Sequence, residues 1–450
     1  MRHVALPVVE QALRAASQTH ALEIGDGAVE ASATIFQKLF PDRPAVVVAD
    51  RQTMRAAGET VMNVFRAASQ PMREPFIFSD PDLYAETRFV TQLESDLRTH
   101  SAIPVAVGSG TINDLTKLAA HRANRSYMCV ATAASMDGYT AFGASITDAG
   151  AKQTFDCPAP VAVIADLNII AQAPAEMSAW GYADLFAKVT AGADWLVADA
   201  LGIEPIDDVP WNIVQGPLGD ALSDPAGVRA HDRNALGRLM EGLMLGGFAM
   251  QAHRSSRPAS GAEHPFSHLW DMQHHVGANG RALSHGLKVG IGTLAVIALF
   301  EALLGQPLET RDIDRCCAAW PDRATWIARA HAQFGDNEEL RAVAEREIAA
   351  KAIDANELRR QLTLLRKIWP ELRESLRAQL IPFEKAAMML AAAGAATRPE
   401  RIGISRERLR ASYLQAYFIR RRVTVLDVAV RTGTLDSLLE EVFRSSGPLG

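Results

Sequence analysis

The sequence contains little cysteine and no excess of positive charge. Its 450 residues include four cysteines, Cys129, Cys157, Cys316 and Cys317, and none of them forms a CxxC pair. This excludes a disulfide-stapled scaffold and a common zinc-ribbon spacing, and it is typical of a reducing cytoplasm. The chain has 46 basic and 52 acidic residues, so its formal net charge is −6. A broad positive field for nucleic-acid binding is therefore absent.

Long hydrophobic runs are also rare. Met1–Pro7 shows no apolar run with a cleavage site, so we expect no export signal. The longest apolar stretch, residues 286–305, approaches the length of a membrane span but contains Lys288, Glu301 and several glycines. These residues favour a buried core helix. We expect neither a membrane nor a nucleic acid as partner.

Short apolar runs in the first third of the chain predict strands that are covered on both faces. They fall at residues 45–49, 76–78, 105–107, 128–131 and 161–165. Helical patterns alternate with them, which predicts parallel strands joined by right-handed crossovers. Asp80 followed by Pro81 is typical of a helix start, and this helix is expected to run to about Leu97.

After about Pro174 the strand-like runs almost vanish and helical apolar spacing dominates, as in residues 340–365 and 371–380. The sequence therefore predicts an α/β lobe with a parallel sheet in residues 1–173. An all-helical lobe is expected in residues 174–450.

A glycine loop follows the predicted strand that ends at Val107. It reads Gly108-Ser109-Gly110-Thr111 and leads into a helix start, an arrangement that can hold a phosphate against free backbone N–H groups. The loop differs from the GxGxxG pattern, and a tight turn without a ligand is the alternative. Asp50, at the end of another predicted strand, either accepts hydrogen bonds from a ribose or is a solvated strand-end acid.

The strand after the glycine loop ends in small hydroxylated residues and an acid. These are Thr132, Ser135 and Asp137, and Gly138 follows directly. The carboxyl ends of strands are where open α/β sheets bind ligands. Asp137 could bind a substrate hydroxyl, or it could organise the turn at Gly138.

Histidine is concentrated in one part of the chain, with seven of the twelve between His231 and His285. Imidazole is the commonest ligand of catalytic metals. His264 and His268 are four apart and would share a helix face. Residue types and spacing leave two alternatives open, a three-histidine zinc site that includes His285 and no metal site at all.

A second candidate is the pair Asp184 and Lys188, four apart in a helical pattern. The simplest interpretation is a solvated ion pair. However, Asp184 is surrounded by apolar residues, and a carboxylate in such surroundings must be paired, protonated or bound to a metal.

Several segments together resemble one known family. They are GSGTINDLTK at residues 108–117, ATAASMDG at 131–138, GYADLFAKVTAGADW at 181–195, SRPASGAEHPFSH at 256–268 and SHGLKVG at 284–290. In order and content they resemble the glycerol-1-phosphate dehydrogenases. Their superfamily also contains glycerol dehydrogenase, the iron-dependent alcohol dehydrogenases and dehydroquinate synthase. The implied fold is dehydroquinate synthase-like, with a nucleotide-binding lobe and a helical metal-binding lobe.

The resemblance implies a role for each candidate residue. Residues 108–111, Thr132 and Ser135 would contact NAD or NADP, and Asp137 would bind substrate. Asp184, His264 and His285 would bind one divalent metal ion, with zinc first and nickel or iron as alternatives. His268 would contact substrate, and Asp184 would touch substrate as well as metal. The partner would be a small phosphorylated polyol, and relatives form dimers or larger assemblies.

The sequence also departs from its relatives. Lys188 stands where the iron-dependent alcohol dehydrogenases have a ligand histidine, and Asp184 stands where the synthases have glutamate. Ala141 replaces a serine that contacts the cofactor in the family, and the preceding Thr140 could compensate. The implied reaction interconverts glycerol 1-phosphate and dihydroxyacetone phosphate. The alternatives are a dehydrogenase of unphosphorylated glycerol or another small polyol, a synthase-like lyase, and a non-catalytic NAD-binding protein. Lys188 and Arg257 are candidates for the substrate phosphate.

Overall fold

A computed structural model describes residues 7–148 and 151–450. Met1–Pro7, where we expect no export signal, lies outside the described residues except for Pro7. The chain forms two compact units. The first comprises Met1–Leu185, Asp208–Ala259 and Ala392–Ala395, and the second comprises Phe186–Asp207, Ser260–Ala391 and Ala396–Gly450. The last strand ends before the predicted division between residues 173 and 174. The first unit nevertheless also contains residues 174–185 and 208–259, which are largely helical.

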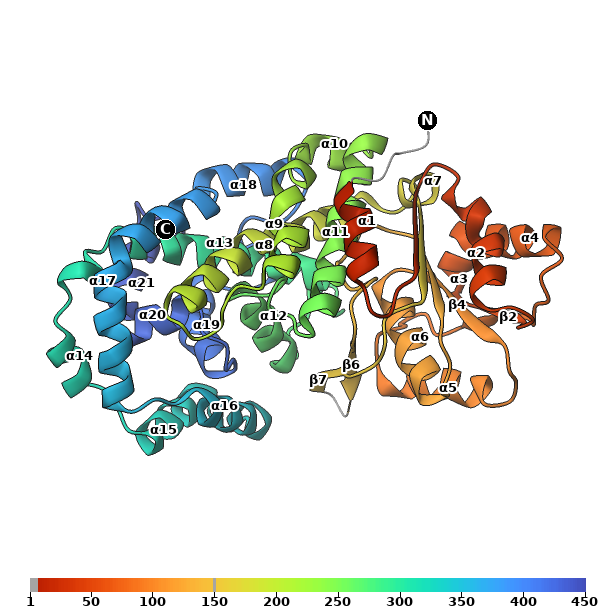
Figure 1. The fold of residues 1–450 in the computed structure, drawn as a ribbon. Helices are drawn as coiled ribbons and strands as arrows, with labels where there is room; N and C mark the ends of the chain where they lie inside the picture. Colours follow the sequence, from red (N-terminus) through yellow and green to blue (C-terminus); the bar gives the residue numbers. More distant parts are fainter. Residues whose placement is uncertain (1–6, 149–150) are drawn as a thin grey trace. The chain divides into compact units, whose positions relative to one another are not determined.

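A six-stranded parallel sheet is the frame of the first unit (Figure 1). Its spatial order is β1-β8-β5-β4-β2-β3. The strands are β1 Ala21–Gly25, β2 Ala45–Asp50, β3 Phe76–Phe78, β4 Ile103–Gly108, β5 Met128–Ala131 and β8 Ala162–Asp166. The predicted parallel α/β fold is therefore confirmed. Every strand predicted from an apolar run is present, and β1 is an additional strand.

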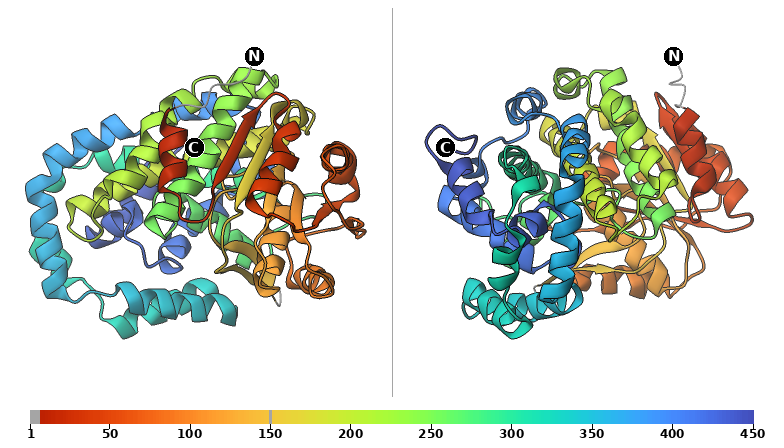
Figure 2. Two further views of the ribbon diagram at one scale, coloured as in Figure 1. Left: turned by 45° about the vertical axis from the view of Figure 1, so that its right-hand side comes forward. Right: turned by 60° about the vertical axis from the view of Figure 1, so that its left-hand side comes forward.

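Helices cover the sheet, and the strands remain almost wholly apolar because both faces are buried. On one face Val105 and Val107 of β4 pack with Phe36 of α2 (Ser32–Leu39) and Phe65 of α4 (Glu59–Ala67). β1 and β8 lie side by side in a further view (Figure 2, left). The other helices of the first unit include α1 Pro7–Ala15, α5 Thr87–Leu97, α6 Gly110–Arg122, α9 Asp208–Ala221, α10 Pro225–Arg229 and α11 Arg233–His253.

One local prediction in this unit needs correction, and one element of it was not predicted. The helix expected to start at Asp80 begins only at Thr87, because Glu86 is extended and bridges to Thr147. The Asp80 carboxylate instead accepts from the N–H of Asp82 in a turn. An antiparallel hairpin that the sequence did not predict, β6 Ala144–Asp148 with β7 Ala151–Phe155, follows the loop after β5.

The second unit is built from helices. They are α12 Glu263–Met272, α13 His285–Leu304, α14 Ile313–Ala318, α15 Arg323–Phe334, α16 Glu338–Lys351, α17 Ala355–Gln379, α18 Phe383–Ala392, α19 Arg406–Phe418, α20 Val425–Arg431 and α21 Leu435–Phe443. α18 ends at the edge of this unit. The long helix α8, Ala175–Ala200, contributes residues to both units. The region expected to be helical over 340–365 is two helices, because the backbone is extended at Ala352 and Asp354 caps α17.

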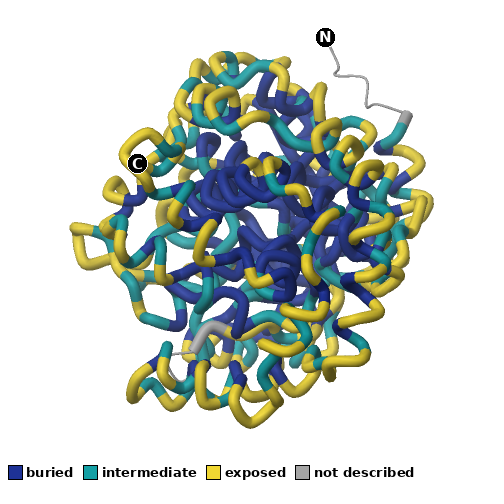
Figure 3. The backbone as a smooth tube through the Cα atoms, turned by 90° about the vertical axis from the view of Figure 1, so that its left-hand side faces the viewer, coloured by how far each residue is buried: buried dark blue, intermediate teal, exposed yellow. Residues whose placement is uncertain are grey.

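The long apolar helix α13 is part of the protein core. It is long and hydrophobic enough to span a membrane, but 89% of its most apolar window is buried within the protein. It packs with Trp270 and Tyr413 among other large side chains. The tube view shows buried segments in the interior and exposed turns on the outside (Figure 3). The prediction of a buried core helix is therefore confirmed.

Candidate active site

The glycine loop joins β4 directly to α6. Ser109 is the N-cap residue, and its side chain makes no capping hydrogen bond to the helix. A Cβ atom on Gly108 would lie 2.5 Å from Cβ of Ile112, so a larger residue would displace the first turn of α6. On Gly110 it would lie 3.2 Å from Cε of Met136. The loop thus offers backbone N–H groups that no side chain caps. Its glycines carry no side chain that would keep a ligand away from them, and both features suit a phosphate.

The end of β5 lies beside this loop. The N–H of Thr132 donates to the carbonyl oxygen of Gly108 at 3.1 Å, so the two predicted cofactor segments are adjacent. Ser135 is half-buried, and its side chain is hydrogen-bonded to Tyr139. This places Thr132 and Ser135 close to the glycine loop, as their predicted role requires.

Asp50 has a structural role of its own at the end of β2. Its Oδ1 accepts from the N–H groups of Gln52 and Thr53, each at 2.7 Å, and the hydroxyl of Thr53 accepts from the N–H of Asp50. This capping box accounts for an acid at this position without a ligand. The ribose contact remains a prediction.

Lys117 of α6 fixes the loop that follows Asp137. Its ammonium group is buried and donates to three backbone carbonyls, those of Gly138, Ala141 and Gly143, at 3.1, 2.9 and 2.9 Å. Sequence reasoning assigned no role to this residue, although it belongs to the GSGTINDLTK segment. A buried lysine that binds three carbonyls holds the loop in one conformation.

The residue expected to compensate for Ala141 serves the packing of this loop. The hydroxyl of Thr140 donates to the carbonyl oxygen of Met244 at 2.7 Å, and the carbonyl oxygen of Thr140 accepts from Nε2 of Gln251 at 2.5 Å. Thr140 is also wholly buried. Its hydroxyl hydrogen is therefore engaged with α11.

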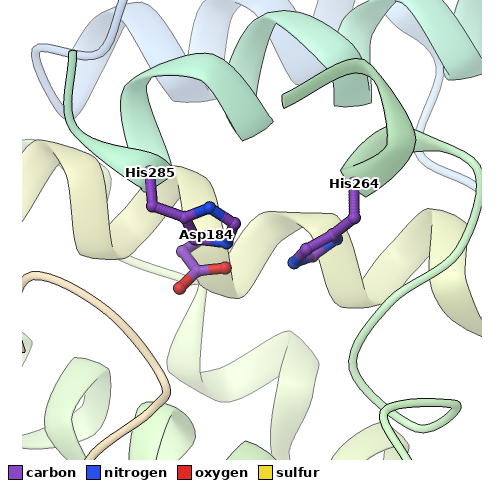
Figure 4. A group of neighbouring side chains, drawn as sticks. All are labelled: Asp184, His264 and His285. Atoms are coloured by element: carbon purple, nitrogen blue, oxygen red, sulfur yellow. The ribbon is translucent and has the colours of Figure 1, made fainter. Parts of the chain in front are cut away.

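Three residues far apart in sequence form a cluster of potential metal ligands (Figure 4). Asp184 lies on α8, His264 lies on α12 and His285 is the first residue of α13. One ligand atom from each residue lies within 4.8 Å of the other two. Asp184 and His264 are buried and His285 is half-buried. A carboxylate and two imidazoles in this arrangement suit zinc, nickel or iron.

Asp137 and His268 lie beside this cluster. The N–H of Asp137 donates to Oδ2 of Asp184 at 3.1 Å, so the predicted substrate residue and the predicted metal ligand are joined directly. The ring of His268 is centred 6.2 Å from the rings of both His264 and His285. The cluster of potential ligands contains Asp184 rather than His268, unlike the three-histidine alternative.

Glu263 orients one of the imidazoles. Its carboxylate accepts from Nδ1 of His264 at 2.7 Å, from the hydroxyl of Thr190 at 2.6 Å and from the N–H of Gly261 at 2.6 Å. Burial raises the pKa of Glu263, but the hydrogen bonds from His264 and Thr190 outweigh it, and the pKa lies below its usual value. The carboxylate thus stays ionised and leaves Nε2 of His264 as the atom available to a metal.

His285 has a weaker partner. Oγ of Ser267 lies 3.4 Å from its Nδ1, which again leaves Nε2 as the potential ligand atom. A carboxylate is one of the usual partners of a metal-bound imidazole, and the hydroxyl of Ser267 can accept from the other one. The residues present therefore fit a divalent metal ion.

Buried ion pairs and carboxylates hold the supporting elements in place. Asp194 of α8 accepts from the N–H groups of Ala262 and Val425, each at 2.6 Å. The ammonium group of Lys288 on α13 pairs with Asp271 on α12. Sequence reasoning missed these groups and Glu263. The signal for Glu263 was its position directly before His264, in a segment of glycine, alanine and proline.

Lys188 and Arg257, the two candidates for a substrate phosphate, are both completely buried. A cation without solvent exposure needs compensating partners wherever it lies. Their role in phosphate binding remains a prediction.

Replacing Glu263 with glutamine is expected to weaken zinc binding by about 10–100-fold, because His264 would lose its charged partner. Affinity can be measured by titrating metal-free protein with zinc against a chromophoric chelator. Glu345→Gln is a matched control, since Glu345 also contacts an imidazole, that of His331, but on the surface. Equal affinities for the two variants would contradict the role given to Glu263.

Comparison with known proteins agrees with this fold. The sequence profile of the family described as "Iron-containing alcohol dehydrogenase" matches residues 23–174. The structure resembles that of a probable glycerol dehydrogenase from Sinorhizobium meliloti 1021, with a TM-score of 0.60 and 17% identity over 94% of this chain and 98% of the other. At that identity the likeness shows the fold. The profile match and the fold are both those of the iron-containing alcohol dehydrogenase superfamily.

Two curated relatives identify the family within this superfamily. Glycerol-1-phosphate dehydrogenase [NAD(P)+] of Bacillus licheniformis is 32% identical over 64% of this chain and 72% of the relative. The enzyme of the same name from Bacillus velezensis is 32% identical over 71% of this chain and 84% of the relative. The chain belongs to the glycerol-1-phosphate dehydrogenase family.

Proposed function

We propose that the protein catalyses the NAD(P)-dependent interconversion of glycerol 1-phosphate and dihydroxyacetone phosphate. The observation that carries the proposal is the convergence of Asp184, His264 and His285 in a chain whose curated relatives have this activity in their names. When bound, the metal ion would act as a Lewis acid toward a substrate oxygen, and the nicotinamide cofactor would exchange a hydride with the substrate carbon.

The residues of the chain would bind and orient the two partners. Gly108, Ser109, Gly110 and Thr111 would receive the pyrophosphate at the start of α6, where uncapped N–H groups face it. Thr132 and Ser135 would contact the same cofactor from the end of β5. Asp50 would contact the ribose through Oδ2, since Oδ1 caps α3 (Arg51–Thr53). NAD and NADP both remain candidates for the cofactor.

Asp184 would serve as a metal ligand and touch the substrate, while Asp137 would accept a hydrogen bond from a substrate hydroxyl. The hydrogen bond from the N–H of Asp137 to the carboxylate of Asp184 supports this pairing, because it fixes the backbone of Asp137 relative to the Asp184 carboxylate. His268 would contact substrate and exchange its proton with the substrate oxygen. Its position one helical turn after His264 supports that role.

Metal, assembly and location are part of the same proposal. Zinc is the first choice for the ion, and nickel or iron would fit the same donors. We expect a homo-oligomer, a dimer or larger, with no nucleic acid or membrane as partner. All four cysteines are free, which supports a reducing cytoplasm.

A comparison of substrates tests the proposal. With the metal-loaded enzyme and NADH or NADPH, kcat/KM for dihydroxyacetone phosphate is expected to exceed that for dihydroxyacetone by at least about 100-fold, since a site built to pair a charged group rejects an analogue that lacks it. Measurement of nucleotide oxidation at 340 nm gives both values. Preference for the unphosphorylated ketone, or for glycerol in the reverse direction, would replace the proposal by a polyol dehydrogenase.

A further inference from the structure

A small cavity within the helical unit is lined by residues that the candidate active site does not use. Trp320, Trp326, Lys351, Tyr417 and Arg431 contribute to its wall. The space open to a water-sized sphere is about 10 Å³. A water molecule needs roughly 10–15 Å³ by this measure, so the cavity has room for a single particle of about that size.

Two N–H groups of the lining residues lack a hydrogen-bond partner. Nε1 of Trp326 and Nε of Arg431 are buried and make no hydrogen bond within residues 7–148 and 151–450. The two residues are only 7% and 5% exposed. Leaving such donors unpaired costs about 1–3 kcal/mol each. By contrast, Nε1 of Trp320 donates to the carbonyl oxygen of Ile353 at 2.9 Å.

Positive charge exceeds negative charge at the wall. Nζ of Lys351 lies 3.4 Å from Oδ1 of Asp427, and Nη2 of Arg431 lies 3.4 Å from the same oxygen. Lys351 also donates to the carbonyl oxygen of Tyr417 at 2.6 Å and sits 3.5 Å from the centre of its ring. Two buried cations thus share one carboxylate, which is itself only 1% exposed.

Two further acids act electrostatically on these cations, Glu347 on Lys351 and Glu357 on Arg431, but both are paired with other arginines. Glu347 is held by Arg421 through two hydrogen bonds of 2.8 Å and by Arg346 at 3.1 Å. Glu357 accepts two hydrogen bonds from Arg360, at 2.8 and 2.7 Å. The charges of both acids are therefore already balanced by these arginines. Burial lowers the pKa of Lys351 to about 8, with Asp427 opposing the shift and Arg431 adding to it.

We propose that this cavity binds a single halide-sized monovalent anion, held by the N–H groups of Trp326 and Arg431 and by the ammonium group of Lys351. An anion accepts from all these donors and also supplies the missing negative charge. A water molecule would satisfy the donors but leave the charge imbalance. The bound ion would connect α15, α16, α19 and α20, which contribute Trp326, Lys351, Tyr417 and Arg431.

Thermal unfolding with chloride as the probe tests the site. At constant ionic strength, replacing sodium gluconate with sodium chloride is expected to raise Tm by about 2 °C in a saturable way, since the ion binds only the folded state. Trp326→Phe keeps an aromatic ring but loses the indole N–H group and should abolish the rise. Trp320→Phe loses an indole N–H that is bonded elsewhere, so the rise should persist. An equal chloride response in the two variants would overturn the proposal.

A second measurement does not depend on the stability of the variants. Crystals of the unaltered protein grown or soaked with sodium bromide should show an anomalous peak inside the cavity, within hydrogen-bond distance of Trp326 and Arg431. A water molecule there, or a cavity without a bromide peak, would overturn the proposal. Neither result would affect the proposed dehydrogenase activity, since the two sites share no residue.

Discussion

Replacing Asp184 with alanine is expected to lower kcat by about three orders of magnitude, while the Kd for NAD(P)H changes by less than about twofold. The carboxylate is one of three potential ligands, and the loss of Lewis-acid assistance is worth several kcal/mol, at 1.36 kcal/mol per tenfold in rate. The predicted nucleotide contacts lie in the glycine loop and at the ends of β2 and β5, and Asp184 is not one of them. Steady-state kinetics and nucleotide fluorescence titration measure the two quantities.

Two further variants separate a chemical from a structural effect. Asp184→Asn keeps the shape and an acceptor for the N–H of Asp137 but removes the charge, so it should lose activity while retaining Tm. Asp199→Ala removes an exposed acid of the same helix that accepts from the N–H of Ile206. It should retain full activity. Wild-type rates in both Asp184 variants would refute the metal assignment.

Replacing Gly181 with alanine is expected to destabilise the folded protein by about 3 kcal/mol and lower Tm by about 5 °C. A Cβ atom there would lie 1.9 Å from the carbonyl oxygen of Ala134 and 3.2 Å from Cδ1 of Leu243. The backbone at Ala134 would therefore have to move, and Ser135 and Asp137 follow it directly. We also expect a higher KM for the nucleotide.

Gly219 provides the matched control for this prediction. It also lies within a helix, α9, but a Cβ atom on it would meet nothing within 4 Å. Gly219→Ala should be neutral or stabilise the protein by up to about 1 kcal/mol through helix propensity. Thermal unfolding compares the two, and a Gly181→Ala variant as stable as Gly219→Ala would show that α8 and the Ala134 backbone are not in close contact.

A strand could be predicted from the sequence where both of its faces are buried. Strands covered on both faces appear as continuous apolar runs, so β2, β4, β5 and β8 were predictable. β1 was missed because Glu23 interrupts its apolar residues and most of the strand is only half-buried. The late start of α5 depends on the bridge between Glu86 and Thr147, a long-range contact that no local pattern encodes.

The candidate site was predictable only in part. Residue types and spacing suggested a set of histidines, His264, His268 and His285. They did not join Asp184 to that set or exclude His268 from it. The family resemblance supplied that grouping, and in the structure the three side chains converge. Groups that orient the ligands, such as Glu263 and Asp194, were not predicted because their partners are backbone and side-chain groups brought together by the fold.

The most direct test of the account is a crystal structure of metal-loaded enzyme with element-specific anomalous scattering. The expected result is one ion per chain, at about 2.0–2.2 Å from a carboxylate oxygen of Asp184 and from Nε2 of both His264 and His285. At least one further coordination position should be open to solvent or substrate. An ion bound by other residues, or full turnover by protein with no ion at these three side chains, would contradict it.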